Sequence, residues 1–228
     1  LMWQYTDGTA GPEPHTVKGI GKVDRSFFNV DYKFLATMKN VVVDLSYLNE
    51  NVNLEAARDD GITTVVHQCT RGSDFVDPKY SATKAAAEKL GLTWAAYHFA
   101  TGSDGAKQAE HFIKHAGTVK RYIVDLESNP QGSTVGKAQA EALVQKIKEK
   151  TGSYPIVYGS KYFLDALNSQ VLAKCPLWVA SYNSSPKMPK NWSSWLMWQY
   201  TDGSVGPTPH TVKGIGKVDR SYLNSDSL

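Results

Sequence analysis

Cysteine, long apolar runs and charge of one sign are all scarce in this chain of 228 residues. Its two cysteines, Cys69 and Cys175, are too few for a disulfide framework, and their spacing matches no zinc motif. Two buried thiols are the favoured interpretation, with a single disulfide as the alternative. No apolar run approaches the ~20 residues that a membrane-spanning helix needs, so insertion into a membrane is not expected.

The first residues also lack a targeting signal. Leu-Met-Trp-Gln-Tyr-Thr-Asp-Gly has neither the basic start nor the apolar stretch of a signal peptide, so secretion by that route is not expected. A net charge of +3, evenly spread, argues against nucleic acid as a partner, although it favours approach to an anionic polymer. With 41% hydrophobic and 21% charged residues, the composition is that of a globular protein with one large domain or two small ones.

What the chain does contain is a long internal repeat. Residues 1–26 recur as residues 196–221 at a constant offset of 195, and only positions 9, 10 and 13 differ from their counterparts. Solenoid units are roughly 20–50 residues long, so this offset corresponds to a whole domain instead. We therefore expect residues 1–37 to be a duplicated C-terminal segment plus linker, followed by one complete domain over residues 38–228.

The two copies would compete for one place in that domain. We expect the C-terminal copy to occupy it, because residues 183–194 connect it directly to the preceding strand. The spare copy, which carries Asp24 as the counterpart of Asp219, then packs outside, stays mobile or swaps into a second molecule. Segment-swapped self-association through residues 1–26 is thus one of three outcomes that the sequence leaves open.

Strands and helices alternate over the rest of the chain. Short β-branched runs and helical periodicity predict helices over 52–60, 78–90, 106–116 and 134–151, the last one capped by Thr134 and ended by Gly152. The predicted strands are 41–46, 62–68, 92–99, 121–127, 154–158, 177–182, 195–200 and 218–219. Such alternation is typical of a parallel sheet, and eight strands predict a closed barrel. Residues 41–223 are fewer than the ~250 usual for this architecture. The expected fold class is therefore α/β, a distorted (β/α)8 TIM-like barrel with helices missing in its second half.

Four acidic residues fall at predicted strand ends, where such a barrel holds its active site. They are Asp44, Asp125, Glu127 and Asp219. Asp125 and Glu127 are at i and i+2 of one predicted strand, so they would project from the same face, roughly 6–7 Å apart along it. Two close carboxyl groups drive their pKa values apart, which supplies the protonated acid and the carboxylate of glycoside hydrolysis. The alternative is that strand-end acids merely cap helices or pair with basic residues.

Aromatic residues gather at the same strand ends. Tyr97, His98, Phe99, Tyr158, Trp178, Tyr182 and the run Trp198-Gln199-Tyr200 follow this pattern. Aromatic rings pack against the apolar faces of sugars, and their polar tips form hydrogen bonds with ring substituents. These side chains are either core residues or the walls of a sugar groove.

Eight sequence elements occur in the order in which glycoside hydrolase family 25 has them. From about Asn40 to Leu223 the chain therefore resembles that family, the Chalaropsis- or phage-type lysozymes. The elements are Val-Val-Asp-Leu-Ser (42–46), Asp77-Pro78, Tyr97-His98-Phe99, Val-Asp-Leu-Glu (124–127), Tyr-Pro-Ile-Val-Tyr (154–158), Leu-Trp-Val-Ala (177–180), Trp-Gln-Tyr-Thr-Asp-Gly (198–203) and Gly-Lys-Val-Asp (216–219). The resemblance implies a muramidase that cleaves the β-1,4 bond between N-acetylmuramic acid and N-acetylglucosamine in bacterial peptidoglycan, without metal or cofactor. It places the site of action at the cell wall. A chain without a signal peptide could reach the wall in the way that a phage lysin does, by release from the host cytoplasm.

The resemblance also assigns roles to residues. Glu127 would donate the proton to the leaving oxygen. Asp125 would assist the substrate's own 2-acetamido group as internal nucleophile, or else attack directly; the sequence leaves both mechanisms open. Asp44 and Asp219 would be supporting acids. The implied substrate-binding residues are Tyr97, His98, Phe99, Tyr158, Trp178 and Gln199.

The chain departs from the family pattern after the second strand. Where the family often has Lys-Ala-Thr-Glu-Gly, this chain has Gln68-Cys69-Thr70-Arg71-Gly72, so that Arg71 replaces an acid. Two alternatives to a muramidase stay open: a non-catalytic wall-binding or structural module on a lysozyme-like barrel, and a chitinase-like activity.

Overall fold

The computed structural model describes residues 39–224 and 228, and within the first 38 residues only 2–6, 9, 16–17, 21–22 and 25–28. The chain divides into two compact units, Leu1–Met38 and Lys39–Leu228. The second unit contains all of the predicted strand and helix pattern, and the first contains the N-terminal copy of the repeat. Each unit is described here by itself.

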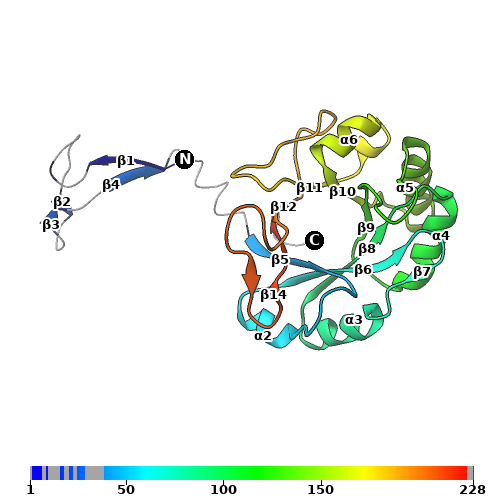
Figure 1. Cartoon of the computed structure of the whole chain (residues 1–228), viewed down its shortest axis with the longest axis horizontal. Coiled ribbons are helices and arrows are strands. Elements are labelled where there is room, and N and C mark those ends of the chain that lie inside the picture. The colour runs from blue at the N-terminus through cyan, green and yellow to red at the C-terminus, as the bar shows by residue number, and fades with distance from the viewer. Residues whose placement is uncertain are drawn as a thin grey trace. The chain divides into compact units, whose positions relative to one another are not determined.

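Eight strands of the second unit close into a barrel, with helices on its outside (Figure 1). In barrel order they are β5 (Lys39–Leu45), β6 (Thr64–Arg71), β8 (Thr93–Phe99), β9 (Tyr122–Asp125), β10 (Ile156–Ser160), β11 (Leu177–Ala180), β12 (Met197–Thr201) and β15 (Asp219–Leu223). Pairing of β5 with β6 on one side and with β15 on the other completes the ring. The short β7 (Phe75–Val76) extends β6 outside it. The α/β barrel predicted from the sequence is thus confirmed.

The barrel is not purely parallel. β15 runs antiparallel to both of its neighbours, β12 and β5, whereas the other ring pairs are parallel. The expected all-parallel sheet is therefore wrong at this strand. The reason is the connection: β12 and β15 are joined by residues 202–218, which hold the small hairpin of β13 (Thr211–Val212) and β14 (Gly216–Lys217) in place of a crossover helix.

Helices follow mainly the first half of the barrel. They are α2 (Leu54–Asp59), α3 (Tyr80–Lys89), α4 (Gly105–Ala116), α5 (Lys137–Thr151) and the short α6 (Lys161–Leu167), with a 3-10 turn at Leu172–Lys174. The connections from β11 to β12 and from β12 to β15, described throughout, contain no helix, as predicted for the second half. None of the helices in the described residues is both long and apolar enough to cross a membrane.

Two helix predictions differ from the structure. α5 begins at Lys137 and not at Thr134, because the Thr134 hydroxyl accepts a hydrogen bond from the Asn129 backbone N–H (3.0 Å) and so holds the preceding loop. α6 was not predicted. Its two turns follow β10 directly, and the Ser160 side chain caps it by accepting from the Phe163 N–H (3.2 Å).

The barrel is filled by apolar side chains from each of its eight strands. This core layer consists of Val42, Val66, Ala95, Ile123, Ile156, Trp178, Met197, Leu223 and Leu228. All are at most 6% exposed. Burial of these side chains stabilises the barrel and fixes which face of each strand points inward.

The first unit is a separate hairpin that repeats the register of the last barrel strands. β1 (Met2–Thr6) pairs antiparallel with β4 (Arg25–Phe28), and β2 (Thr16–Val17) pairs with β3 (Gly21–Lys22). The partners Met2↔Phe28, Gln4↔Ser26 and Thr6↔Arg25 correspond at the same offset to Met197↔Leu223, Gln199↔Ser221 and Thr201↔Arg220, and the same irregularity follows Gln4 and Gln199. In the second unit the C-terminal copy lies between β11 and β5, as expected. Asp24 and residues 29–38 of the expected linker lie outside the described residues.

Candidate active site

Polar side chains form a layer directly above the apolar core of the barrel. Val42, Ile123, Ile156 and Met197 are in the core layer, and two residues further along the same strands are Asp44, Asp125, Tyr158 and Gln199. Because a step of two residues returns to the same face of a strand, these four side chains also point into the barrel, at its open end. The strand period that builds the core thus also assembles the site.

These residues line a pocket of about 200 Å³. The pocket is formed by Asp44, Tyr97, Asp125, Glu127, Tyr158, Trp178, Tyr182, Gln199, Asp202 and Asp219. Eight of the ten site residues predicted from the sequence are therefore brought together here. Among the described residues, no group of three or more His, Cys, Asp or Glu side chains has an arrangement that could hold a metal ion.

Asp44 and Asp219 face each other across the closure of the barrel, where they are paired in the register of β5 and β15. Burial raises the pKa of the Asp44 carboxyl well above its ordinary value, and the neighbouring Asp219 raises it further. Burial also raises the pKa of Asp219 to about 6, although a hydrogen bond from Asp44 opposes this rise. We infer that Asp44 holds a proton and donates it to the Asp219 carboxylate.

Gln199 connects this pair to the aromatic wall. Its Nε2 donates to both oxygens of Asp44 (3.1 Å each), while its Oε1 accepts from the hydroxyls of Tyr158 (2.7 Å) and Tyr182 (2.9 Å). Only 2% of Gln199 is exposed. Its amide is thus fully engaged within the protein, and it orients the groups around it.

Asp125 is the most isolated acid of the pocket. Burial raises the pKa of its carboxyl well above the ordinary value. The charges of Glu127, Asp44 and Asp219 raise this pKa further. Its Oδ1 is buried without a hydrogen-bond partner in the described part of the chain. Because a buried carboxyl oxygen without a donor is costly, this atom is suited to accept a hydrogen bond from a ligand.

Glu127 lies just beyond the strand, at the mouth of the pocket. β9 ends at Asp125, so the predicted strand 121–127 is two residues too long, although the Leu126 N–H still bonds to the Tyr158 carbonyl (3.0 Å). The Glu127 side chain reaches solvent, yet the surrounding walls raise its pKa by desolvation, and Asp219 raises it further. A carboxyl group that is accessible and readily protonated has the properties of a general acid.

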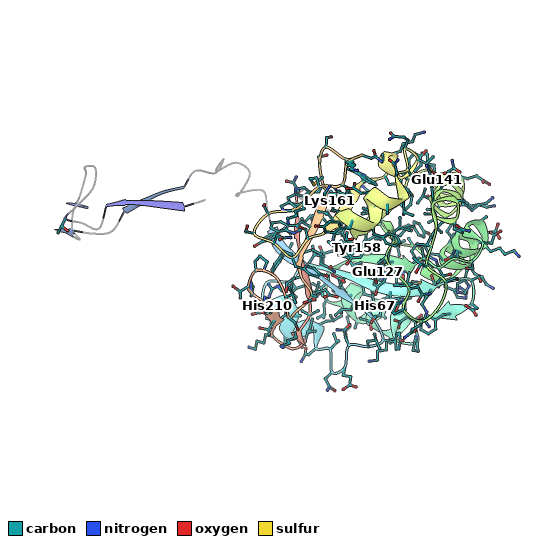
Figure 2. The ribbon with its side chains drawn as sticks, turned by 45° about the horizontal axis from the view of Figure 1, so that its top comes forward. His67, Glu127, Glu141, Tyr158, Lys161 and His210 are labelled. Atoms are coloured by element: carbon teal, nitrogen blue, oxygen red, sulfur yellow. The ribbon has the colours of Figure 1, made fainter. Side chains whose placement is uncertain are left out.

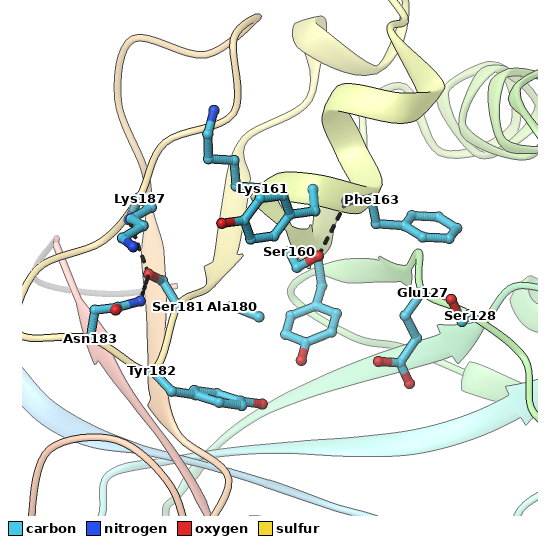
Figure 3. Close-up of a pocket in the computed structure, with 12 residues that line it drawn as sticks. Glu127, Ser128, Ser160, Lys161, Phe163, Ala180, Ser181, Tyr182, Asn183 and Lys187 are labelled. Atoms are coloured by element: carbon cyan, nitrogen blue, oxygen red, sulfur yellow. Dashed lines mark hydrogen bonds between the residues drawn. The ribbon is translucent and has the colours of Figure 1, made fainter.

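A larger hollow of about 600 Å³ adjoins the pocket and shares Glu127, Tyr158 and Tyr182 with it. Figure 3 shows Tyr182 and Glu127 reaching into this hollow, below Ser160 and Lys161 at the start of α6. Glu127, Tyr158 and Lys161, which all line this hollow, are labelled in Figure 2. The two cavities together form a groove that passes Glu127.

The remaining aromatic residues of the pocket form its floor and wall. Trp178 is 2% exposed, packs against Tyr158 with ring centroids 4.7 Å apart, and donates from Nε1 to the Ser221 hydroxyl (3.0 Å). Burial raises the pKa of the Tyr97 hydroxyl, and the nearby Asp125 raises it further, so Tyr97 stays a neutral hydrogen-bond donor.

His98 and Phe99 are not among the residues that line the pocket. His98 is fully buried on the outer face of β8, where it bonds to the Thr70 hydroxyl (2.8 Å) and the Gln108 side chain (3.1 Å) and packs against Phe112 of α4. Alternation along the strand explains this placement: when Tyr97 points inward, His98 must point outward. Applying the two-residue strand period to Tyr97-His98-Phe99 would have assigned His98 to the opposite face of the strand from Tyr97.

Two further residues complete the pocket. Tyr182, one of the aromatic groove candidates, follows β11, which ends at Ala180 and not at Tyr182 as predicted, and Asp202, which was not among the candidates, follows β12. Asp202 also shapes its own turn by accepting from the N–H groups of Ser204 (2.8 Å) and Val205 (2.7 Å). The position of Asp202 just after a predicted strand was the sequence feature that could have indicated its place in the site.

Both cysteines are free, buried thiols, as the sequence favoured. Burial raises the pKa of Cys69 and of Cys175 to about 12. Neither lines the acidic pocket.

Comparison with known proteins adds one family model and three similar proteins. The family model described as glycosyl hydrolases family 25 matches residues 43–208. Lysozyme M1 of Streptomyces globisporus is 26% identical over 205 residues, which cover 81% of this chain and 68% of that protein. Among solved structures, the bacterial lysozyme from Streptomyces coelicolor has a TM-score of 0.72 and 26% identity, covering 82% of this chain and 94% of its own. The muramidase from Acremonium alcalophilum has a TM-score of 0.70 and 27% identity, covering 81% and 93%.

Proposed function

Because the chain belongs to glycosyl hydrolase family 25 and is therefore a glycoside hydrolase, we propose that it hydrolyses bacterial peptidoglycan at the β-1,4 bond from N-acetylmuramic acid to N-acetylglucosamine. The observation that carries this proposal is the gathering of Asp44, Asp125, Glu127 and Asp219 in one pocket beside a long groove. Its site of action is then the cell wall.

Glu127 acts as the general acid. It lies where the two cavities of the groove meet, so a bond of a bound glycan can be placed beside its carboxyl group. Its raised pKa keeps a larger share of the group protonated near neutral pH, and the proton passes to the leaving glycosidic oxygen.

Asp125 assists the 2-acetamido group of the substrate. Its unpartnered Oδ1 accepts the acetamido N–H, which orients the acetamido oxygen toward the anomeric carbon. Water then opens the resulting cyclic intermediate. The alternative, direct attack by Asp125, requires its ionised form, which burial and three neighbouring acids disfavour.

Asp44 and Asp219 support this arrangement from the opposite wall. The Asp44–Asp219 pair and Gln199 hold Tyr158 and Tyr182 in position, and these with Tyr97 and Trp178 surround the sugar ring. We do not assign substrate contacts to His98 or Phe99, because neither lines the pocket.

The decisive experiment measures release of reducing ends from purified cell walls, together with loss of turbidity. Glu127→Gln should lower the rate by about 10²–10⁴-fold, the usual contribution of a general acid. Glu50→Gln, an exposed acid outside the groove, is the matched control and should retain wild-type activity. If the wild-type chain releases no reducing ends, the protein is not a muramidase, and a non-catalytic wall module becomes the better interpretation. If Glu127→Gln lyses walls at the wild-type rate, the acid is misassigned.

A second experiment separates the two roles of Asp125. Peptidoglycan whose muramic acid has lost its N-acetyl group lacks the internal nucleophile, so its cleavage should fall to the level of Asp125→Asn. Direct attack by Asp125 would leave this substrate cleavable and would accumulate a covalent glycosyl-enzyme.

The repeated segment has a proposed role of its own. Residues 1–37 are a duplicated hairpin plus linker, and residues 38–228 are the catalytic domain. Since β1–β4 repeats the register of β12–β15, it can take that position in a second copy of the chain and so support segment-swapped self-association. Light scattering on the full chain and on a chain without residues 1–37 tests this: an unchanged oligomeric state and unchanged activity would make the copy dispensable.

A further inference from the structure

Arg71 is a cation held close to the acidic pocket. It is the last residue of β6, and the strand register runs from Arg71 to Phe99 and from Phe99 to Asp125. The Cα atoms of Arg71 and Asp125 are therefore two strand spacings apart, which is about 10 Å. That distance is comparable to the length of one or two sugar units, so a group attached to a bound glycan can reach Arg71.

The guanidinium of Arg71 is oriented but not neutralised. Its Nη1 donates to Oε1 of Gln131 (2.8 Å), and its central carbon lies 4.7 Å above the ring of Phe75. The ion pairs formed within residues 39–224 include none with Arg71. A guanidinium carries five N–H donors, and the bond to Gln131 uses one of them. The group is thus preorganised to receive an anion.

A surface hollow provides room for that anion. It has a volume of about 550 Å³ and is lined by Arg71, Gly72, Ser73, Asp74, Phe75, Thr101 and Ser103. Its polar side chains besides Arg71 are three hydroxyls and the carboxyl group of Asp74, and the hydroxyls of Thr101 and Ser103 bond to each other (2.9 Å). The hollow lies at the ends of β6 and β8, whereas the groove past Glu127 extends over β10 and β11.

Charge on the two sides of the acidic pocket favours this hollow as an anion site. The pocket itself, with its acids, repels a carboxylate. On the opposite side the larger hollow has two lysines, Lys161 and Lys187. The Nζ of Lys161 contacts Oδ2 of Asp165 (2.8 Å) and the Met188 carbonyl (3.1 Å), and neither lysine offers the planar donor fork of an arginine. Arg71 combines a fixed fork with an unpaired charge, which is the geometry that binds carboxylates through two parallel hydrogen bonds.

We propose that Arg71 binds a carboxylate of the peptide that muramic acid carries through its lactyl group, so that the enzyme recognises peptide-bearing glycan in preference to bare glycan. The assignment rests on the proposed function for its substrate class. It makes Arg71, with Gln131 and Phe75 holding its guanidinium, a specificity-determining residue of this chain.

Binding of a product muropeptide tests the proposal without depending on catalysis. The probe is N-acetylglucosaminyl-N-acetylmuramic acid with its peptide attached, which does not contain the bond to be cleaved. The comparison ligands are the same disaccharide without peptide, with its free lactyl carboxyl amidated, and the muropeptide with its carboxylates amidated. Titration calorimetry with the wild-type chain should show tighter binding of the ionised muropeptide, and Arg71→Gln should weaken that binding about tenfold while leaving the other two ligands unchanged.

Matched variants make the result specific. Arg121→Gln removes the same charge from an exposed arginine at the other end of β9 and should keep the preference. An equal loss for all three ligands in Arg71→Gln, or a preference that survives this substitution, would overturn the assignment. If the wild type prefers the ionised muropeptide but cleaves no cell wall, the catalytic proposal fails while the assignment of Arg71 stands.

Discussion

Replacing Asp219 with asparagine should stabilise the folded chain at neutral pH, even though Asp219 belongs to the active site. Its pKa is about 6 in the folded chain against an ordinary value of 3.8. Between these values an unfolded chain releases the proton while the folded chain keeps it, so the folded state loses stability as the pH rises and the full cost is present above pH 6. Each tenfold change in the dissociation constant corresponds to about 1.4 kcal/mol, which gives an upper limit of about 3 kcal/mol.

Urea unfolding of the wild type and of Asp219→Asn at pH 4 and pH 7.5 measures this cost. The stabilisation by the substitution should be larger at pH 7.5 than at pH 4, by up to about 2 kcal/mol, because part of the ionisation cost is already present at pH 4. Effects of the amide that do not involve ionisation cancel between the two conditions. Glu50→Gln serves as control, since it removes one charge from an exposed position. A stability difference that is the same at both pH values would refute the inference that folding holds the proton on this acid.

Three further predictions concern catalysis and packing. Because Asp219 helps to raise the pKa of Glu127, the decline of kcat/KM at high pH should move to lower pH in Asp219→Asn; an unshifted pH–rate profile would contradict the coupling. Tyr162 is 77% exposed beside the larger hollow and should act as a sugar-stacking surface. Tyr162→Ala should therefore raise KM several-fold and change the free energy of unfolding by less than about 0.5 kcal/mol. An unchanged KM would exclude this role. Gly105→Ala would place a Cβ against the Gln139 carbonyl of α5 and should destabilise the chain by about 1–3 kcal/mol in urea unfolding; a wild-type midpoint would show that the two helices can separate at no cost.

The strand period carried most of the information that the sequence held about the site. Val42 and Asp44, or Ile123 and Asp125, differ by two positions, and this spacing alone places an acid above the core of a barrel strand. The β-branched runs similarly located the barrel strands, because burial on both faces of a strand leaves a strong apolar signal. Site residues that share a strand with core residues could therefore be predicted from the sequence.

Features that depend on loops and on tertiary contacts could not be predicted from residue periodicity. Asp202 enters the pocket from the loop after β12, and Thr134 bonds to Asn129 instead of capping α5. The reversed direction of β15 follows from the length and content of the connection before it, and residue periodicity does not encode strand direction. His98 was misplaced for a simpler reason, since the motif was read as a unit and not residue by residue along the strand.

The two hairpins of this chain bear on how the barrel folds. β1–β4 forms a two-stranded sheet, whereas β12–β15 is flanked by β11 and β5, yet both have the same partners and the same irregularity. The matching registers indicate that the sequence of this segment itself favours one strand registration. Closing the barrel brings Gln199 to Asp44 across 155 positions of sequence, a contact that is slow to find by random search. We expect the chain to make that search with a hairpin whose strands are already aligned, so that closure of the barrel and assembly of the acidic pocket occur in one late step of folding.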